Sequence, residues 1–145
     1  MKGHRVSEAI KLFLFNESAQ RFAQAKTGTI VGISSVAGDR GRGGLPSYAA
    51  SKAGLTTYLE SMRNRVGALG VKVVTVKPGP IETPMTEGLD SLPLLITADE
   101  AAKQIVAGAR RGSNVVYVPF AWRPIMAIIR AVPSFIFQRL KKLNS

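Results

Sequence analysis

The sequence predicts an α/β fold with a parallel sheet, because short β-branched runs alternate with longer segments of helical periodicity. Residues 29–33 and 71–76 are two such runs, and a helical segment separates them. A strand, a helix and a second strand in this order form a right-handed βαβ unit. The composition, 145 residues with 46% hydrophobic and 20% charged side chains, is typical of one folded domain.

The N-terminal segment is the first element. Between residues 6 and 26 apolar side chains recur at spacings of three and four, which predicts a helix. The polar run at 16–18 either interrupts this helix or starts it afresh. Gly28 then ends the segment, and the run TIVGI at 29–33 predicts a short buried strand.

The middle of the chain continues the alternation. Residues 36–46 hold four glycines and a proline and predict a loop, after which Ser47 is a candidate N-cap for a helix that reaches about Leu69. Gly70 provides a helix stop before the strand at 71–76. The proline-rich segment 78–86 predicts a rigid loop at the same end of the sheet as Ser35.

The last regular elements are a helix at 97–111 and a strand at 114–118. Thr97 is an N-cap candidate, and the acidic first turn and basic last turn complement the helix dipole. We therefore expect a first domain over residues 1–119 and a separate tail over 120–145.

The tail is apolar, aromatic and basic. Its uncharged runs are shorter than the ~20 residues that a membrane-spanning helix requires. Two interpretations stay open: an interfacial segment at 120–143 that contacts a membrane surface, or a segment that covers the domain's own core or a partner subunit.

Composition excludes several classes of site. The chain has no cysteine and one histidine, His4, which argues against a disulfide framework, a metal site and a Ser-His-Asp triad. The absence of cysteine is compatible with a cytoplasmic protein. The net charge of +11 suits an anionic partner, but no nucleic-acid-binding motif accompanies it, so we expect no specific nucleic-acid partner.

Residues 34–52 carry the most suggestive chemistry. Tyr48 and Lys52 are four positions apart, so on a helix the phenol and the ammonium would be neighbours. A nearby cation favours the phenolate form of a tyrosine, which could then exchange a proton with an alcohol or ketone. Ser35, thirteen positions before Tyr48, could hold the reacting oxygen. Tyrosine and lysine at this spacing are common on amphipathic helices. The surrounding motifs must therefore decide whether Tyr48 and Lys52 are catalytic or only part of a helix surface.

Three ordered motifs supply that context. GTIVGISSVAG, PSYAASKAG and VKVVTVKPGPIETPM together resemble the short-chain dehydrogenase/reductase family, specifically its catalytic and C-terminal half, from about Gly28 to Pro119. The resemblance implies a partial Rossmann-type, doubly wound parallel sheet with flanking helices. It also implies an oxidoreductase that transfers hydride between NADP or NAD and a carbonyl or alcohol substrate.

The resemblance assigns roles to particular residues. Tyr48 matches the catalytic proton donor and acceptor, Lys52 the residue that favours its ionised form and holds the nicotinamide ribose, and Ser35 the substrate-orienting serine; Ser34 is the weaker candidate. A P-G-x-I-x-T loop that touches the nicotinamide end is matched by Pro78, Gly79, Ile81 and Thr83.

The departures from the family are equally informative. No glycine-rich βα turn for the pyrophosphate precedes these motifs, and the glycines at 38–44 lack the G-x-G-x-x-G spacing. We therefore expect a truncated member, or an inactive fragment that acts by association with a subunit or a membrane surface. An exposed sheet edge would favour pairing, so a homo-oligomer is expected. The apolar, basic tail resembles that of reductases with lipid-like substrates.

Overall fold

The computed structural model describes residues 2–84, 86, 88 and 92–140, with side chains from residue 11 onward. Its helices and strands alternate along the chain as the sequence predicts. The elements are α1 (Lys2–Ala25), β1 (Thr29–Ile33), η1 (Val36–Gly38), α2 (Pro46–Val66), η2 (Gly67–Leu69), β2 (Lys72–Pro78), α3 (Ala98–Arg110), β3 (Val115–Val118), α4 (Trp122–Ala131) and α5 (Ser134–Phe137), where η denotes a short 3-10 helix.

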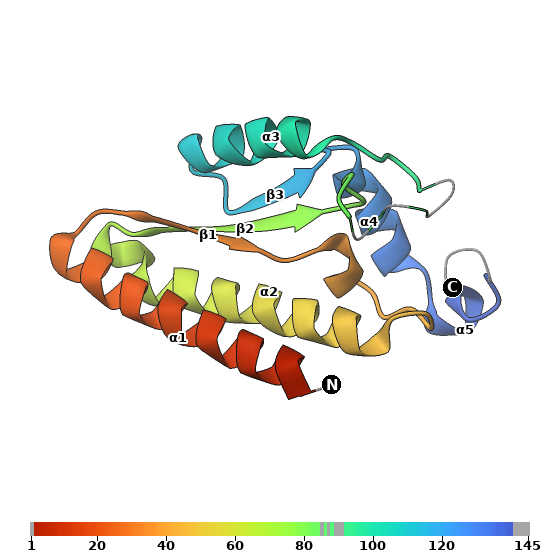
Figure 1. Ribbon diagram of the computed structural model, residues 1–145, viewed down its shortest axis with the longest axis horizontal. Helices are drawn as coiled ribbons and strands as arrows, with labels where there is room; N and C mark the ends of the chain where they lie inside the picture. Colours follow the sequence, from red (N-terminus) through yellow and green to blue (C-terminus); the bar gives the residue numbers. More distant parts are fainter. Residues whose placement is uncertain (1, 85, 87, 89–91, 141–145) are drawn as a thin grey trace.

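Three parallel strands form one sheet in the order β1-β2-β3. Thr29 pairs with Lys72, and Thr75 pairs with Val115. Helices α1 and α2 lie against one face of the sheet, whereas α3 lies against the other (Figure 1). This arrangement confirms the predicted α/β class and the partial Rossmann-like sheet.

The core has one apolar cluster on each face of the sheet. Under α2, Leu59 is fully buried and packs over β1, where the lack of a side chain at Gly32 makes room for it. A Cβ at Gly32 would lie 2.2 Å from the Leu59 side chain. On the α3 face the buried members are Val74, Val76, Ala101 and Val118.

Most element boundaries agree with the sequence, and one predicted cap does not. Thr97 accepts a hydrogen bond from the Glu100 N–H at 3.2 Å and so caps α3, as expected. Gly70 adopts the left-handed conformation, with φ of 80°, that ends the segment after α2. Ser47 is not the N-cap of α2, because Pro46 already occupies the first helical turn.

The N-terminal helix is continuous through residues 16–18. Its partner α2 explains the continuity: Ala19 is fully buried in the cluster beneath both helices, and the Tyr58 hydroxyl donates to the Leu12 carbonyl at 3.0 Å. Packing of one face therefore outweighs the low helix propensity of Asn16 and Ser18.

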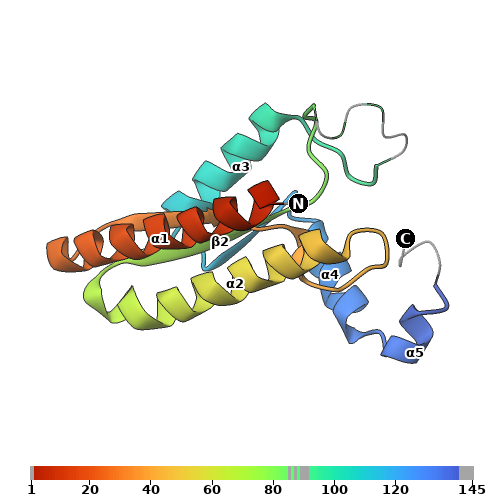
Figure 2. The same cartoon turned by 60° about the horizontal axis from the view of Figure 1, so that its bottom comes forward.

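The C-terminal segment forms two short helices, of which α4 lies beside the carboxyl end of β3 (Figure 1) and α5 lies beyond α4 (Figure 2). Trp122 and Met126 are buried and pack with Val36 of η1. Within the residues that the structure describes, no helix is long and apolar enough to cross a membrane.

Candidate active site

The three parallel strands end at one edge of the sheet, and the predicted site residues follow them. Because β1 ends at Ile33, β2 at Pro78 and β3 at Val118, the segments that leave these strands meet at that edge. Ligand sites of open α/β sheets lie at such an edge. Ser35 and the loop after Pro78 thus lie at the same end of the sheet, as the sequence predicts.

The structure places Tyr48 and Lys52 together on the first turns of α2. The Lys52 ammonium lies 5.6 Å from the centroid of the Tyr48 ring, and Tyr48 is 39% exposed. Lys52 Nζ also donates a hydrogen bond to the Ile33 carbonyl at 3.1 Å, which ties the ammonium to the end of β1. A fixed cation therefore lies beside an accessible phenol.

The two serines after β1 make different contacts. The Ser34 hydroxyl donates to the Lys52 carbonyl at 2.9 Å and lies 2.7 Å from the Thr56 hydroxyl, so it joins β1 to α2. The Ser35 hydroxyl accepts from the Ala37 N–H at 3.1 Å and donates to the Pro78 carbonyl at 3.4 Å. Ser34 is thus engaged in packing the helix, whereas Ser35 connects the segments that leave β1 and β2.

The bond from Ser35 to Pro78 is long for a hydroxyl donor, and such bonds are weak. The proton of Ser35 can therefore turn toward a better acceptor at little cost. An incoming carbonyl oxygen would be such an acceptor.

Gly79 lies in a position that requires glycine. Its N–H donates to the Val118 carbonyl at 2.9 Å, and a Cβ would come within 2.0 Å of the Trp122 indole nitrogen. That nitrogen is buried and has no hydrogen-bond partner among the described residues. Trp122 is therefore packed directly onto the start of the predicted cofactor loop.

Ile81 and Thr83 lie farther along this loop. Ile81 forms a parallel bridge with Ile96, and its side chain packs against the α3-face cluster. The Thr86 hydroxyl lies 2.7 Å from the Ile81 carbonyl and accepts from the Thr83 N–H at 2.9 Å.

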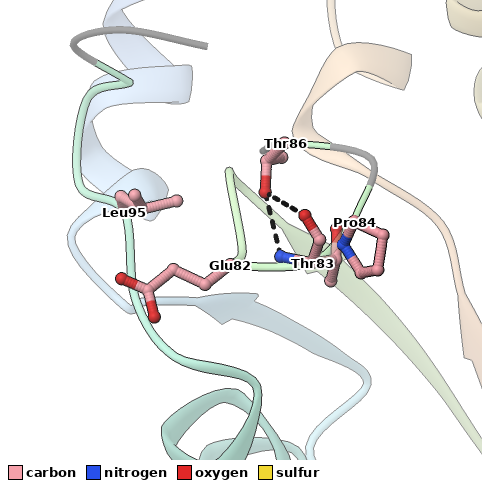
Figure 3. Close-up of a pocket in the computed structure, with 5 residues that line it drawn as sticks. All are labelled: Glu82, Thr83, Pro84, Thr86 and Leu95. Carbon is pink, nitrogen blue, oxygen red and sulfur yellow. Dashed lines mark hydrogen bonds between the residues drawn. The ribbon is translucent and has the colours of Figure 1, made fainter. Parts of the chain in front are cut away.

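An open hollow of about 370 Å³ lies beside this turn (Figure 3). Thr83 is exposed at its rim. The residues that line this hollow are Glu82, Thr83, Pro84, Thr86 and Leu95.

A buried charged cluster next to the site was not predicted from the sequence. Lys77 Nζ lies 2.5 Å from Asp39 Oδ1, and the Tyr117 hydroxyl donates to Asp39 Oδ2 at 2.6 Å. The side chains of Lys77 and Asp39 are only 7% and 3% exposed. We call these three residues the Asp39 cluster; it joins the segment after β1 to the ends of β2 and β3.

Burial raises the pKa of Tyr117 to about 12, and the hydrogen bond to the Asp39 carboxylate adds to the effect. Tyr117 is therefore a hydrogen-bond donor at neutral pH. The sequence signal for this cluster was Lys77, a charged residue directly after the β-branched run 73–76.

The described residues hold no group of three or more histidine, cysteine, aspartate or glutamate side chains suited to a metal ion. Tyrosine, lysine and serine groups instead dominate this edge of the sheet.

Comparison with known proteins assigns the chain to a family. Residues 11–92, more than half of the chain, match the short chain dehydrogenase family. The chain belongs to this family. The matched range contains Ser35, Tyr48, Lys52 and the loop 78–83, whereas Tyr117 lies beyond it.

Relatives of this short-chain dehydrogenase include two bacterial proteins. An uncharacterized oxidoreductase of Mycobacterium tuberculosis (strain CDC 1551 / Oshkosh) is 31% identical over 129 residues, which is 89% of this chain and 52% of the relative. An uncharacterized oxidoreductase of Streptomyces coelicolor is 38% identical over 113 residues, or 78% of this chain and 45% of the relative. The chain therefore spans about half the length of the curated relatives that it matches.

Solved structures agree with this assignment. A short-chain dehydrogenase from Sphingobium yanoikuyae in complex with NADPH superimposes with a TM-score of 0.70 at 25% identity, covering 88% of this chain and 55% of that one. A short chain dehydrogenase from Burkholderia cenocepacia J2315 in complex with NADP gives 0.71 at 27% identity, covering 94% and 60%.

Proposed function

We propose that this chain carries the proton-transfer site of an NAD(P)-dependent oxidoreductase that interconverts a carbonyl and an alcohol. The observation that carries the proposal is the Tyr48–Lys52 pair, an accessible phenol with a cation held 5.6 Å from its ring centroid at the end of β1. The family relation and the NADPH- and NADP-bound structural relatives support it.

The residues fit the nicotinamide end of such a cofactor. Lys52 offers an ammonium donor for ribose hydroxyls, and the exposed Thr83 at the open hollow offers a hydroxyl for the carboxamide. The glycines at 38–44 precede α2 without the dinucleotide spacing, so the fit concerns this end of the cofactor alone.

A bound nicotinamide cofactor would supply or accept the hydride. In the direction of reduction, the Tyr48 hydroxyl donates its proton to the carbonyl oxygen, and the ammonium of Lys52 stabilises the phenolate left behind. The Ser35 hydroxyl turns from the Pro78 carbonyl to hold the same oxygen. In the direction of oxidation, Tyr48 accepts the proton from the alcohol.

Two measurements on the chain test this proposal. Calorimetric titration with NADPH and NADH measures cofactor binding, and a panel of carbonyl compounds that includes long-chain substrates measures turnover. We expect Tyr48→Phe to lower kcat by roughly 10²- to 10⁴-fold and to leave cofactor affinity nearly unchanged.

Tyr58→Phe is the matched control, since Tyr58 lies on the same helix and bonds only the Leu12 carbonyl among its described contacts. Equal activity of the Tyr48→Phe and Tyr58→Phe proteins would refute the role of Tyr48. A folded chain that binds neither nucleotide would favour the alternative, a non-catalytic member that acts by association.

A further inference from the structure

Helix α4 is apolar on both of its faces, although only one is covered. Trp122 and Met126 are buried, and Ile129 is half-buried on the same side. At 100° per residue the opposite side of the helix carries Pro124, Ala127, Ile128 and Ala131, all exposed. The charged residues of this helix, Arg123 and Arg130, share one flank between the two apolar sides, so the outer side presents an uncovered apolar stripe that is suited to a partner.

The flanking segments extend this exposed apolar surface. Ile128 is 69% exposed, and Phe120 and Phe135 are each 66% exposed. Helices α4 and α5 lie at one end of the molecule, the end at which α2 begins (Figures 1 and 2). We call the exposed apolar side chains of these two helices the C-terminal apolar face; its members are Pro124, Ala127, Ile128, Ala131, Phe135 and Ile136.

This face is held in place by contacts with the domain. Phe137 is buried, and the Arg40 guanidinium lies 4.5 Å from its ring centroid. Arg40 also donates to the Arg130 carbonyl at 3.2 Å. The loop between η1 and α2 therefore holds the end of α4 and the end of α5, so the apolar residues of these helices are presented on an ordered support.

The positive charge of the C-terminal segment indicates the kind of partner that would bind there. The sequence contains no aspartate or glutamate after Glu100, whereas Arg123 and Arg139 accompany the apolar face, and Lys141 and Lys142 follow it in the sequence. The Arg130 side chain instead interacts with Tyr117. Two copies of such a surface would repel each other. A partner with an apolar layer beneath negative charges would complement both the apolar side chains and the positive charge of the segment.

We propose that the C-terminal apolar face docks on the surface of an anionic phospholipid membrane. The short helices α4 and α5 lie in the plane of the interface, with Ile128 and Phe135 among the acyl chains and Arg123 and Arg139 at the phosphates. This inference rests on the C-terminal segment and is independent of the proposed catalytic function.

Vesicle flotation tests the proposal. The probes are vesicles of phosphatidylcholine alone and vesicles that also contain phosphatidylglycerol. We expect the chain to float with the anionic vesicles at low salt, to bind them more weakly at high salt, and to stay unbound with the neutral ones. Absence of binding to the anionic vesicles at low salt would overturn the proposal.

Variants distinguish this face from the general positive charge of the protein. Ile128→Asp and Phe135→Asp should each weaken binding about tenfold or more, because a buried apolar side chain is lost. Leu69→Asp is the matched control: Leu69 is 48% exposed in η2 at the opposite end of the molecule and should leave binding unchanged.

Charge variants add a second control. Arg123→Gln and Arg139→Gln should each lower the affinity about fivefold, whereas Lys26→Gln and Lys72→Gln, at the other end of the sheet, should have little effect. Equal losses in both pairs would show attraction by net charge alone and would overturn the proposal. The proposal would also be overturned if the chain self-associates without vesicles and Ile128→Asp abolishes this self-association. That result would show that a second copy of the chain occupies the face.

Discussion

The same edge of the sheet is held together in two chemically different ways. On the β1 side, Ser34 and Lys52 join the strand to α2 through hydrogen bonds to backbone carbonyls and a threonine hydroxyl. Across β2 and β3, the Asp39 cluster joins three segments through a buried ion pair and a tyrosine. The first connection is a set of separate bonds, whereas the second depends on all of its members.

The difference matters because a buried charge without its partner is far more costly than a missing neutral hydrogen bond. The β1 side should therefore tolerate single substitutions that the Asp39 cluster does not. The two sides carry the predicted catalytic groups and the predicted cofactor loop, respectively, so they can be perturbed separately.

The largest effect is expected at Lys77. Lys77→Met leaves the Asp39 carboxylate buried without its cation and should lower the free energy of unfolding by about 3–5 kcal/mol, measured by urea denaturation. Lys72→Met in the same strand is the control, because Lys72 is exposed and should change stability by no more than about 0.5 kcal/mol.

Replacing the whole Asp39 cluster sharpens this prediction. The triple variant Asp39→Leu, Lys77→Met, Tyr117→Phe removes all three members of the cluster together and should recover much of the lost stability. A triple variant that is less stable than Lys77→Met would contradict the view that an unpaired charge causes the loss.

Tyr117 gives an intermediate effect with a pH signature. Tyr117→Phe removes a hydrogen bond to a carboxylate and should cost about 1.5–3 kcal/mol at neutral pH. Since the pKa of Tyr117 is raised to about 12, above the ordinary value of 10, its contribution is complete below pH 10 and is lost as the pH rises toward 12.

The free energies of unfolding of the parent chain and of Tyr117→Phe are measured by urea denaturation as the pH is raised from below the ordinary tyrosine pKa toward 12. The difference in stability between the parent chain and Tyr117→Phe should shrink as the pH rises, and the ultraviolet absorbance of the three tyrosines should show one late titration. A constant difference between the two proteins would contradict the assigned role of the Tyr117 proton.

The smallest effect is expected on the β1 side. Ser34→Ala removes the bonds to the Lys52 carbonyl and Thr56 and should cost about 0.5–1.5 kcal/mol in urea denaturation. Ser61→Ala, which deletes an exposed bond within α2, should cost less. A loss at Ser34 as large as that at Lys77 would remove the distinction between the two sides.

The regular elements were predictable because their patterns are local. The β-branched runs at 29–33 and 71–76 and the capped helix after Thr97 each carry their signal within a few residues. Ser47 misled for a local reason too, since a serine and a proline both mark helix starts and the proline stood one position earlier. Helix α4, in contrast, packs through Trp122 on Val36, which lies 86 positions earlier in the chain.

The candidate site also has one part that the local sequence predicts and another that depends on the tertiary fold. The proximity of Tyr48 and Lys52 follows from helical spacing, so the sequence could predict it. The Asp39 cluster brings together residues from three separate segments, and nothing near Asp39 in the sequence points to Lys77 or Tyr117. Only the parallel pairing of β1, β2 and β3 places them at one edge.

The contact between Trp122 and Gly79 has a practical consequence. Trp122 is the single tryptophan of the chain, it is buried, and its indole lies against the first residues of the loop 78–83. Its fluorescence therefore comes from the neighbourhood of the predicted cofactor loop and from nowhere else in the protein. The chain thus contains an intrinsic optical reporter, and changes of emission on adding a nucleotide or a substrate would register at that loop without any label.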